Sequence, residues 1–283
     1  MGSPSPHPLA GRTCLVTGAG SGVGQAIATA FADAGARVWG CDINPNNLAT
    51  TRSQLARSQA PTAVTLERVD VTDRSAVEQW IATAHEATGR IDVLVNNAAF
   101  VSWADVTDAS VADAERTMRT AYDAMVYAVT AGLPTMLAAG RGHIITIGSS
   151  AGRIYAPGPS AAYAAAKAAQ EAYTRILQLE LAPTPVHATL VRPGVITGTQ
   201  FFGDHVPSSR LPRLADFLPT TTAPHVATAV TAAVLRPRNT IDLPRYLPLA
   251  YLAHAVAPRT LQRLAQVGGP SRRDFGAREP TGR

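Results

Sequence analysis

The sequence predicts a single α/β domain built on a doubly wound parallel sheet with helices on both faces. Short apolar runs alternate along the chain with longer segments of helical periodicity, as repeated strand–helix units require. A glycine-rich turn separates the first apolar run from the first helical segment. With 283 residues and 46 % hydrophobic content, the chain can bury one sizeable core, so one domain is sufficient.

The apolar runs and helical patterns also give the order of the elements. We expect strands near residues 12–17, 37–42, 64–69, 91–96, 142–148 and 186–192. We expect helices near residues 22–34, 45–58, 73–87, 109–138, 160–182 and 223–235. Thr72 or Asp73 caps the third helix, and Gly35 ends the first. The expected strand order is 3-2-1-4-5-6, with a short seventh strand left open, which places the active site at the carboxyl ends of the strands.

The glycine-rich turn has the setting that a dinucleotide fingerprint requires. A short apolar run ends at Thr17, the turn carries Gly18, Gly22 and Gly24, and apolar residues then recur with helical spacing. These glycines let the backbone approach a pyrophosphate, which binds at the positive N-terminal end of the helix.

Asp42 ends the second predicted strand about twenty residues later, at the usual distance for a ribose-binding carboxylate. A carboxylate there accepts hydrogen bonds from both ribose hydroxyls and repels a 2′-phosphate. Neither Arg nor Lys stands at Ser21 or just after Asp42 to bind that phosphate. The sequence therefore favours NAD over NADP.

The chain contains a single lysine, Lys167, and it follows Tyr163 by four residues. In a helix this spacing places both side chains on one face. A cation there stabilises the tyrosinate and lowers the pKa of the phenol from its ordinary value of about 10. Tyr163 is therefore a candidate general acid/base, and a surface Tyr–Lys pair on an Ala-rich helix is the alternative.

Six motifs stand in a fixed order along the chain. They are Thr17-Gly-x-x-x-Gly-x-Gly24, Asp70-Val71, Asn96-Asn97-Ala98-Ala99, Gly148-Ser149-Ser150, Tyr163-x-x-x-Lys167 and Pro193-Gly194. With these motifs the chain resembles the short-chain dehydrogenase/reductase family, in its ordinary subtype, over roughly residues 9–200. The resemblance implies a Rossmann-type fold, a nicotinamide cofactor and hydride transfer between a secondary alcohol and a ketone.

The resemblance implies the catalytic residues Ser149, Tyr163 and Lys167. Tyr163 would exchange a proton with the substrate oxygen, which Ser149 would polarise. Lys167 would lower the pKa of Tyr163 and hydrogen-bond the nicotinamide ribose. The identity of the catalytic serine stays open. Aligning Gly152 with the family's glycine selects Ser149, with one extra residue in the loop that follows. The commoner spacing between the serine and the tyrosine selects Ser150. We prefer Ser149.

The resemblance also places the cofactor contacts. Asp70 would accept from the adenine amine, beside the Val71 backbone, and Asn97 would brace the fourth strand near the ribose. Ile196 and Thr197 would meet the carboxamide. Each of these could instead be structural, as strand-end asparagines often are. The full expected set is Gly18, Ser21, Gly22, Val23, Gly24, Asp42, Asp70, Val71, Asn97, Tyr163, Lys167, Ile196 and Thr197.

One position departs from the family's pattern. The family's helical asparagine, which holds a water between the lysine and bulk solvent, falls at Ala121, which has no side-chain donor or acceptor. In this chain, water alone, Thr120 or Asp123 would complete the proton relay from the lysine to solvent. Otherwise the enzyme is slow or has an unusual pH profile, or the fold serves a non-redox task. A milder departure is Ala99 in place of a glycine.

The composition argues against several other classes of protein. Much of the net charge of +5 comes from arginines in the tail, which gives little support to nucleic-acid binding. Histidine spacing suggests no metal site, and Cys14 and Cys41 are expected to be buried hydrophobes. We see no apolar run long enough for a bilayer, and residues 1–8 look like a loose tail instead of a secretory signal. We expect a cytoplasmic protein.

The last third of the chain carries three expectations. Residues 194–222 should form a mobile, apolar lid, or else a surface loop whose aromatics fill the core. The family's usual final strand and glycine-rich end are not evident. Instead, residues 244–267 show an amphipathic helical pattern broken at Pro258, suited to packing on the domain or a second subunit. Docking on a membrane surface is the less favoured use. Residues 268–283 should be disordered.

We therefore expect residues 9–267 to form an NAD-dependent oxidoreductase that interconverts a secondary alcohol and a ketone on a hydrophobic small molecule. By resemblance, it would form a dimer or tetramer through the helices near 109–138 and 160–182. The alternatives are a cyclase, isomerase or dehydratase that uses Tyr163 without net redox, or a cofactor-binding scaffold with weak chemistry. The sequence names neither the substrate nor the physiological direction.

Overall fold

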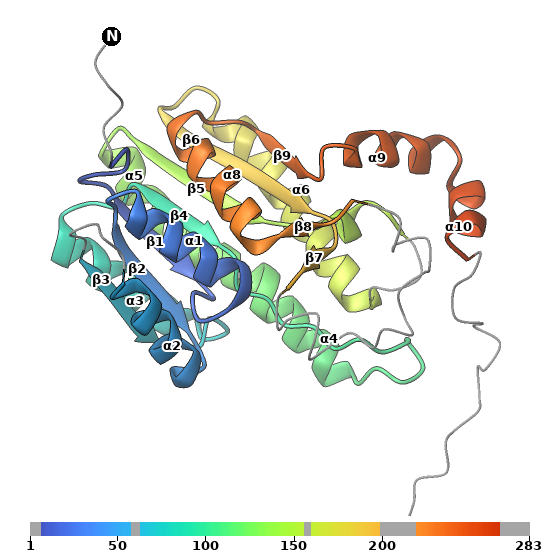
Figure 1. The fold of residues 1–283 in the computed structure, drawn as a ribbon, viewed down its shortest axis with the longest axis horizontal. Coiled ribbons are helices and arrows are strands. Elements are labelled where there is room, and N and C mark those ends of the chain that lie inside the picture. Colours follow the sequence, from blue (N-terminus) through green and yellow to red (C-terminus); the bar gives the residue numbers. More distant parts are fainter. Residues whose placement is uncertain (1–6, 58–62, 156–159, 199–218, 267–283) are drawn as a thin grey trace, which may run out of the picture.

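A parallel sheet of seven strands lies at the centre of the described chain (Figure 1). The computed structural model describes residues 7–57, 63–155, 160–198 and 219–266, with side chains up to residue 263. In spatial order the strands are β3 (Val64–Arg68), β2 (Arg37–Asp42), β1 (Thr13–Thr17), β4 (Val93–Asn96), β5 (Gly142–Ile147), β6 (Val186–Pro193) and β9 (Thr240–Leu243). All neighbouring pairs are parallel, so the predicted order 3-2-1-4-5-6 is confirmed.

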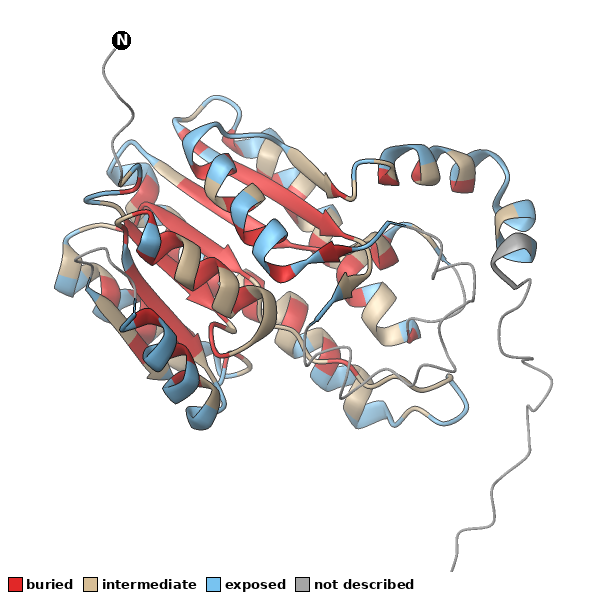
Figure 2. Ribbon diagram, in the orientation of Figure 1, coloured by how far each residue is buried: buried red, intermediate tan, exposed pale blue. Residues whose placement is uncertain are grey.

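Helices cover both faces of this sheet. One face packs against α1 (Gly22–Asp33), α2 (Pro45–Leu55) and α8 (Ala223–Leu235), and the other against α3 (Arg74–Thr88), α5 (Ala124–Ala138) and α6 (Ala161–Leu181). The central strands are buried along nearly their whole length (Figure 2). Because both faces are covered, these strands read in the sequence as continuous apolar runs instead of alternating ones.

Local capping signals place the helix ends. Asp73, and not Thr72, caps α3, because its Oδ1 accepts hydrogen bonds from the backbone N–H groups of Ser75 (2.9 Å) and Ala76 (3.2 Å). Gly35 follows the last turn of α1 with φ of +87°, a conformation that glycine adopts without a steric penalty.

The helix predicted over residues 109–138 is interrupted. α4 (Val111–Met118) leads into a π-helical turn, η1 (Arg119–Asp123), before α5 begins. The residues of η1 are compatible with an ordinary helix, so periodicity gives no sign of the interruption. A π turn inside a helix is frequent at functional sites.

The short seventh strand that the sequence left open, and whose pattern was not evident there, is present as β9. β9 pairs with β6 along its whole length. The buried Arg192 on β6 donates to both carboxylate oxygens of Asp242 on β9, at 2.7 and 2.9 Å, and to Glu171 of α6 at 2.9 Å. A strand of four residues shows too little pattern to be recognised, and this strand depends on a partner far away in the sequence.

The C-terminal segment extends beyond the β9 edge (Figure 1) as α9 (Leu247–Val256) and α10 (Pro258–Gln266). The predicted break at Pro258 is confirmed. α9 buries Leu247, Tyr251 and His254. None of the helices in the described ranges combines the length and apolarity needed to cross a bilayer.

Two shorter strands form a separate pair, β7 (Ile196–Thr197) with β8 (Thr221–Thr222). Most of the predicted lid falls in residues 199–218, which lie outside the described residues, as do residues 1–6, 156–159 and 267–283.

The Arg192 cluster gives a first prediction. Replacing Arg192 with Met should lower the free energy of unfolding by about 3 kcal/mol, because the nearly buried Asp242 would lose the guanidinium that compensates its charge, while Glu171 would keep only its longer contacts to Arg153 and Arg175. The measurement is urea denaturation followed by circular dichroism.

The matched control is Arg74→Met, which removes the exposed Arg74–Glu78 pair and should cost less than about 1 kcal/mol. Equal losses in the two variants would show that the buried cluster has no special weight in holding β9.

Candidate active site

Ser149 and Tyr163 meet at the carboxyl end of β5. Ser149 immediately precedes a 3₁₀ turn, η2 (Ser150–Gly152), and its Oγ accepts a hydrogen bond from the backbone N–H of Ala151 at 3.1 Å. The same side chain hydrogen-bonds Tyr163 on the first turn of α6. Of the two serines considered from the sequence, Ser149 is therefore the one that the fold brings to Tyr163.

Burial dominates the acid–base behaviour of this site. It raises the pKa of Tyr163 to about 12, against the hydrogen bond from Ser149, which lowers it. The expected lowering of this pKa is wrong in direction for this structure, because desolvation of the phenolate outweighs the stabilising contacts. Burial also lowers the pKa of Lys167 to about 7. Both groups are thus held towards their neutral forms.

Lys167 is fixed by contacts to two elements. Its Nζ donates to the carbonyl oxygen of Ile147 at the end of β5 and to Oε1 of Gln170, both at 2.9 Å. The ammonium lies 5.6 Å from the centre of the Tyr163 ring. Tyr163 and Lys167 therefore share one face of α6, as the i,i+4 spacing predicted, and they are not a surface pair.

Gln170 is a site residue that the sequence analysis missed. Its Nε2 donates to the Ala121 carbonyl at 2.8 Å, so Gln170 bridges the π turn to Lys167. The available signal was its place three residues after Lys167, on the face of the helix that carries the tyrosine and the lysine.

The glycine-rich turn is packed without room for side chains. A Cβ added to Gly24 would lie 2.0 Å from the Gly18 carbonyl oxygen and 2.4 Å from Nδ2 of Asn97. Gly18 and Gly22 have positive φ values of 66° and 54°. Asn97 donates to the backbone oxygens of Thr17 (2.9 Å) and Gly18 (3.2 Å), so it braces this turn against the end of β4.

The first helical N–H groups of α1 remain available for an anion. Ser21 is the N-cap residue of α1, and its side chain makes no capping hydrogen bond. Val23 lies in the first turn, just after Gly22. This helix start suits a pyrophosphate, because its unpaired N–H groups and the helix dipole both favour negative charge.

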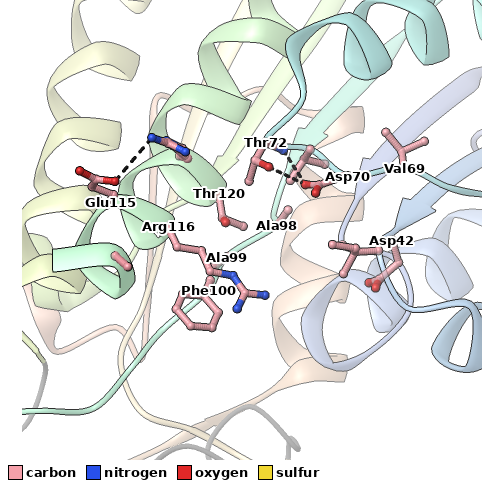
Figure 3. A pocket seen from close by; sticks show the side chains of 15 residues that line it. Asp42, Val69, Asp70, Thr72, Ala98, Ala99, Phe100, Glu115, Arg116 and Thr120 are labelled. Carbon is pink, nitrogen blue, oxygen red and sulfur yellow. Dashed lines mark hydrogen bonds and ion pairs between the residues drawn. The ribbon is translucent and has the colours of Figure 1, made fainter. Parts of the chain in front are cut away.

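A cavity of about 510 Å³ lies beside the glycine-rich turn (Figure 3). Its lining includes Gly18, Asp42, Ile43, Val69, Asp70, Val71, Thr72, Ala98, Ala99, Phe100, Ala112, Glu115, Arg116, Arg119 and Thr120. Asp42 and Asp70 occupy one side of the view, and Phe100 and Arg116 lie across from them. The guanidinium of Arg116 sits 4.0 Å from the Phe100 ring centre, a contact that the sequence did not suggest.

Two carboxylates of this cavity are held in place by the backbone. Asp42 accepts from the N–H of Gly20 through Oδ2 (3.0 Å) and from the N–H of Asn44 through Oδ1 (2.9 Å). Asp70 accepts from the N–H and the hydroxyl of Thr72, at 2.9 and 2.7 Å. These residues fit the adenosine half of a dinucleotide: a preset carboxylate at the end of β2 and a second at the end of β3.

The remaining predicted contacts lie beyond β6. Ile196 and Thr197 form β7, and the Thr197 hydroxyl donates to the Thr221 carbonyl at 3.3 Å. Neither residue lines the cavity described above.

Aromatic groups surround the Tyr163 region. The Trp103 ring lies 6.5 Å from the Tyr163 ring. The segment between Ser149 and Tyr163 meets α9, because the N–H of Tyr155 donates to Nε2 of His254 at 3.4 Å. Helix α9 thus packs beside the segment between Ser149 and Tyr163. The sequence analysis predicted packing on the domain or a second subunit without naming the place.

Comparisons with known proteins agree with this architecture. Residues 12–208 match a family model described as short chain dehydrogenase. An uncharacterized oxidoreductase of Staphylococcus aureus strain MW2 is 34 % identical over 202 residues, which cover 71 % of this chain and 85 % of that protein. A glycine betaine reductase of Emericella nidulans is 36 % identical over 202 residues, which cover 71 % of this chain but only 16 % of that protein.

Solved structures show the same fold. A short-chain dehydrogenase/reductase from Burkholderia phymatum, in complex with NAD, has a TM-score of 0.78 at 24 % identity, covering 90 % of this chain and 96 % of that one. The closed form of serine dehydrogenase complexed with NADP⁺ has a TM-score of 0.72 at 28 % identity, covering 82 % and 94 %.

Proposed function

Since the chain belongs to the short-chain dehydrogenase/reductase family of oxidoreductases, we propose that it interconverts a secondary alcohol and a ketone with NAD as cofactor and Tyr163 as general acid/base. The observation that carries this proposal is the cluster formed by the partly buried Ser149 and Tyr163 with the buried Lys167, at the same edge of the sheet as the glycine-rich turn.

The described residues divide the proton chemistry among them. Tyr163 donates its phenolic proton to the substrate oxygen as a ketone is reduced and takes it back as an alcohol is oxidised. Ser149, already hydrogen-bonded to Tyr163, holds the same oxygen beside the phenol. Lys167 keeps a positive charge close to the ring when the tyrosinate forms. The nicotinamide, when bound, supplies or accepts the hydride.

The arrangement around Asp42 supports NAD. Two backbone N–H groups already fix this carboxylate, and the next residue is the apolar Ile43, so a 2′-phosphate would meet a negative charge with no compensating side chain directly after it. Arg68, on the neighbouring strand, donates to the Ile43 carbonyl at 3.3 Å and is exposed. The complexes of similar proteins contain both NAD and NADP, so the choice depends on these local contacts.

We also propose a hydrophobic small-molecule substrate. The Trp103 ring lies 6.5 Å from the Tyr163 ring, so an aromatic wall borders the catalytic phenol. Such a wall accepts apolar substrate surface, whereas an unpaired polar group would lose hydrogen bonds to water there.

Exposed apolar residues support a homodimer formed through α5 and α6. Ile176 (56 % exposed) and Leu179 (71 %) lie on α6, and Leu137 (42 %) lies near the end of α5. We expect light scattering to report at least twice the monomer mass. A monomeric mass at micromolar concentration would contradict this assembly.

Tyr163→Phe should abolish catalysis. With NADH and a panel of hydrophobic ketones, we expect turnover by the wild type and at least a 100-fold lower rate in the variant, the order of magnitude that general acid catalysis contributes (about 10²–10⁴-fold). Tyr155→Phe, which changes an exposed phenol on the adjacent segment, should keep wild-type turnover. The measurement is the loss of NADH absorbance. Product formation without any change in absorbance would instead favour the non-redox isomerase, cyclase or dehydratase.

The two directions should differ in pH dependence. Ketone reduction needs the protonated phenol and the charged Lys167, and because burial raises the pKa of Tyr163 to about 12 and lowers that of Lys167 to about 7, its rate should stay level from about pH 5 to neutral pH, where both groups hold their protons. Alcohol oxidation needs the tyrosinate, so its rate should rise with pH over the same range. Initial rates in both directions across this range test the sign. An oxidation rate that falls with rising pH would contradict Tyr163 as the base.

Asp42→Asn should shift the cofactor preference. Removing the negative charge while keeping the shape should improve the ratio of NADPH to NADH affinity at least tenfold, about 1.4 kcal/mol. Titration of protein fluorescence with each cofactor measures both dissociation constants. Asp33→Asn removes an exposed charge at the far end of α1 and should leave the ratio unchanged. An unaltered ratio in Asp42→Asn would remove the basis for choosing NAD.

A further inference from the structure

An unbroken row of hydrogen bonds connects the ammonium of Lys167 to the π turn. Lys167 donates to Oε1 of Gln170 at 2.9 Å, and Nε2 of Gln170 donates to the carbonyl oxygen of Ala121 at 2.8 Å. The three residues are 3 %, 1 % and 2 % exposed. The row therefore lies in the protein interior, between α6 and the widened turn of η1.

The chemistry of the partners fixes the orientation of the Gln170 amide. An ammonium can only donate and a backbone carbonyl can only accept, so the oxygen must face Lys167 and the nitrogen must face Ala121. Each end of the amide has a partner in this orientation, and rotating it would lose both hydrogen bonds. Such a side chain specifies a geometry and does not merely fill space.

The same contacts account for the donors of Lys167. Of its three N–H bonds, one goes to the Ile147 carbonyl and one to Gln170. A single N–H is left for a ligand or for the Tyr163 side of the cavity. Tyr163 is the titratable side chain that lies beside the ammonium, and the two described hydrogen-bond acceptors of the ammonium are a backbone carbonyl and an amide.

We propose that Gln170 is a positioning residue for Lys167, holding the ammonium charged and aimed at Tyr163 by tying it to the backbone of the π turn. The amide joins Lys167 to the backbone at Ala121, the position where the resemblance places the family's relay asparagine. A carboxamide neither gains nor loses a proton near neutral pH, so Gln170 orients the lysine without passing protons along this row. The proposal deepens the proposed function, in which the charge of Lys167 supports Tyr163.

The direction of the effect follows from burial. Desolvation lowers the pKa of Lys167 to about 7, and an acceptor for its N–H opposes this by stabilising the charged form. Removing the acceptor should therefore lower the pKa further. If Gln170 only satisfies the Ala121 carbonyl, its loss would cost stability but leave the titration of Lys167 unchanged.

The single lysine makes this measurable without a substrate. Protein labelled with lysine carrying ¹³C at Cε gives one lysine signal, which reports the protonation of Lys167 directly. In Gln170→Met, which has a similar volume but no amide, the pKa of Lys167 should fall by at least about 1 from its wild-type value. The control is Gln178→Met, on the same helix, where Nε2 of Gln178 instead bonds Ala188 and Asn239 backbone oxygens, so this titration should match wild type.

A titration of Gln170→Met that coincides with wild type would overturn the proposal. If this variant does not fold, Gln170→Glu gives the reverse test, because a carboxylate next to the ammonium should raise the pKa of Lys167 above the wild-type value. No change there would overturn the proposal equally. Because the readout needs no turnover, a shifted lysine in a protein without redox activity would defeat the proposed function and leave the role of Gln170 standing.

Discussion

The burial of one ammonium group is the constraint on which the catalytic end of the fold depends. A charge this far from water must be matched by acceptors, and the fold provides them from β5 and, through Gln170, from the π turn. The end of β5 and helix α6 contact the ammonium directly, and the π turn between α4 and α5 is joined to it through Gln170. The phenol of Tyr163 lies beside the ammonium, and desolvation disfavours the charged form of both groups.

The C-terminal segment is joined to the same region by aromatic and ionic contacts. The Tyr251 ring of α9 lies under the guanidinium groups of Arg192 (4.4 Å) and Arg153 (5.4 Å). Arg192 also bonds Glu171, the residue after Gln170 on α6. Strand β9, helix α9 and the segment after Ser149 are thus held by one cluster, so the edge of the catalytic region is built in part by residues from the end of the chain.

Local patterns in the sequence were sufficient for the glycine-rich turn and the shared face of Tyr163 and Lys167, because each depends on neighbours within a few residues. The sheet order followed from the repeated strand–helix units. β9, the π turn and Gln170 were beyond such patterns. β9 is only four residues long and relies on Arg192, and the π turn meets its partner 49 residues further along the chain. The raised pKa of Tyr163 was also missed, since desolvation depends on the packed structure and not on the spacing of residues.

Because the only lysine is buried, every cationic side chain on the surface of this protein is a guanidinium or a histidine. Guanidinium groups stay protonated and do not act as nucleophiles near neutral pH. Acetyl donors, reducing sugars and amine-directed cross-linkers would therefore find no lysine on the outside of the folded domain. Reactions that acetylate, glycate or cross-link proteins through lysine therefore have only one possible lysine target here, the buried Lys167.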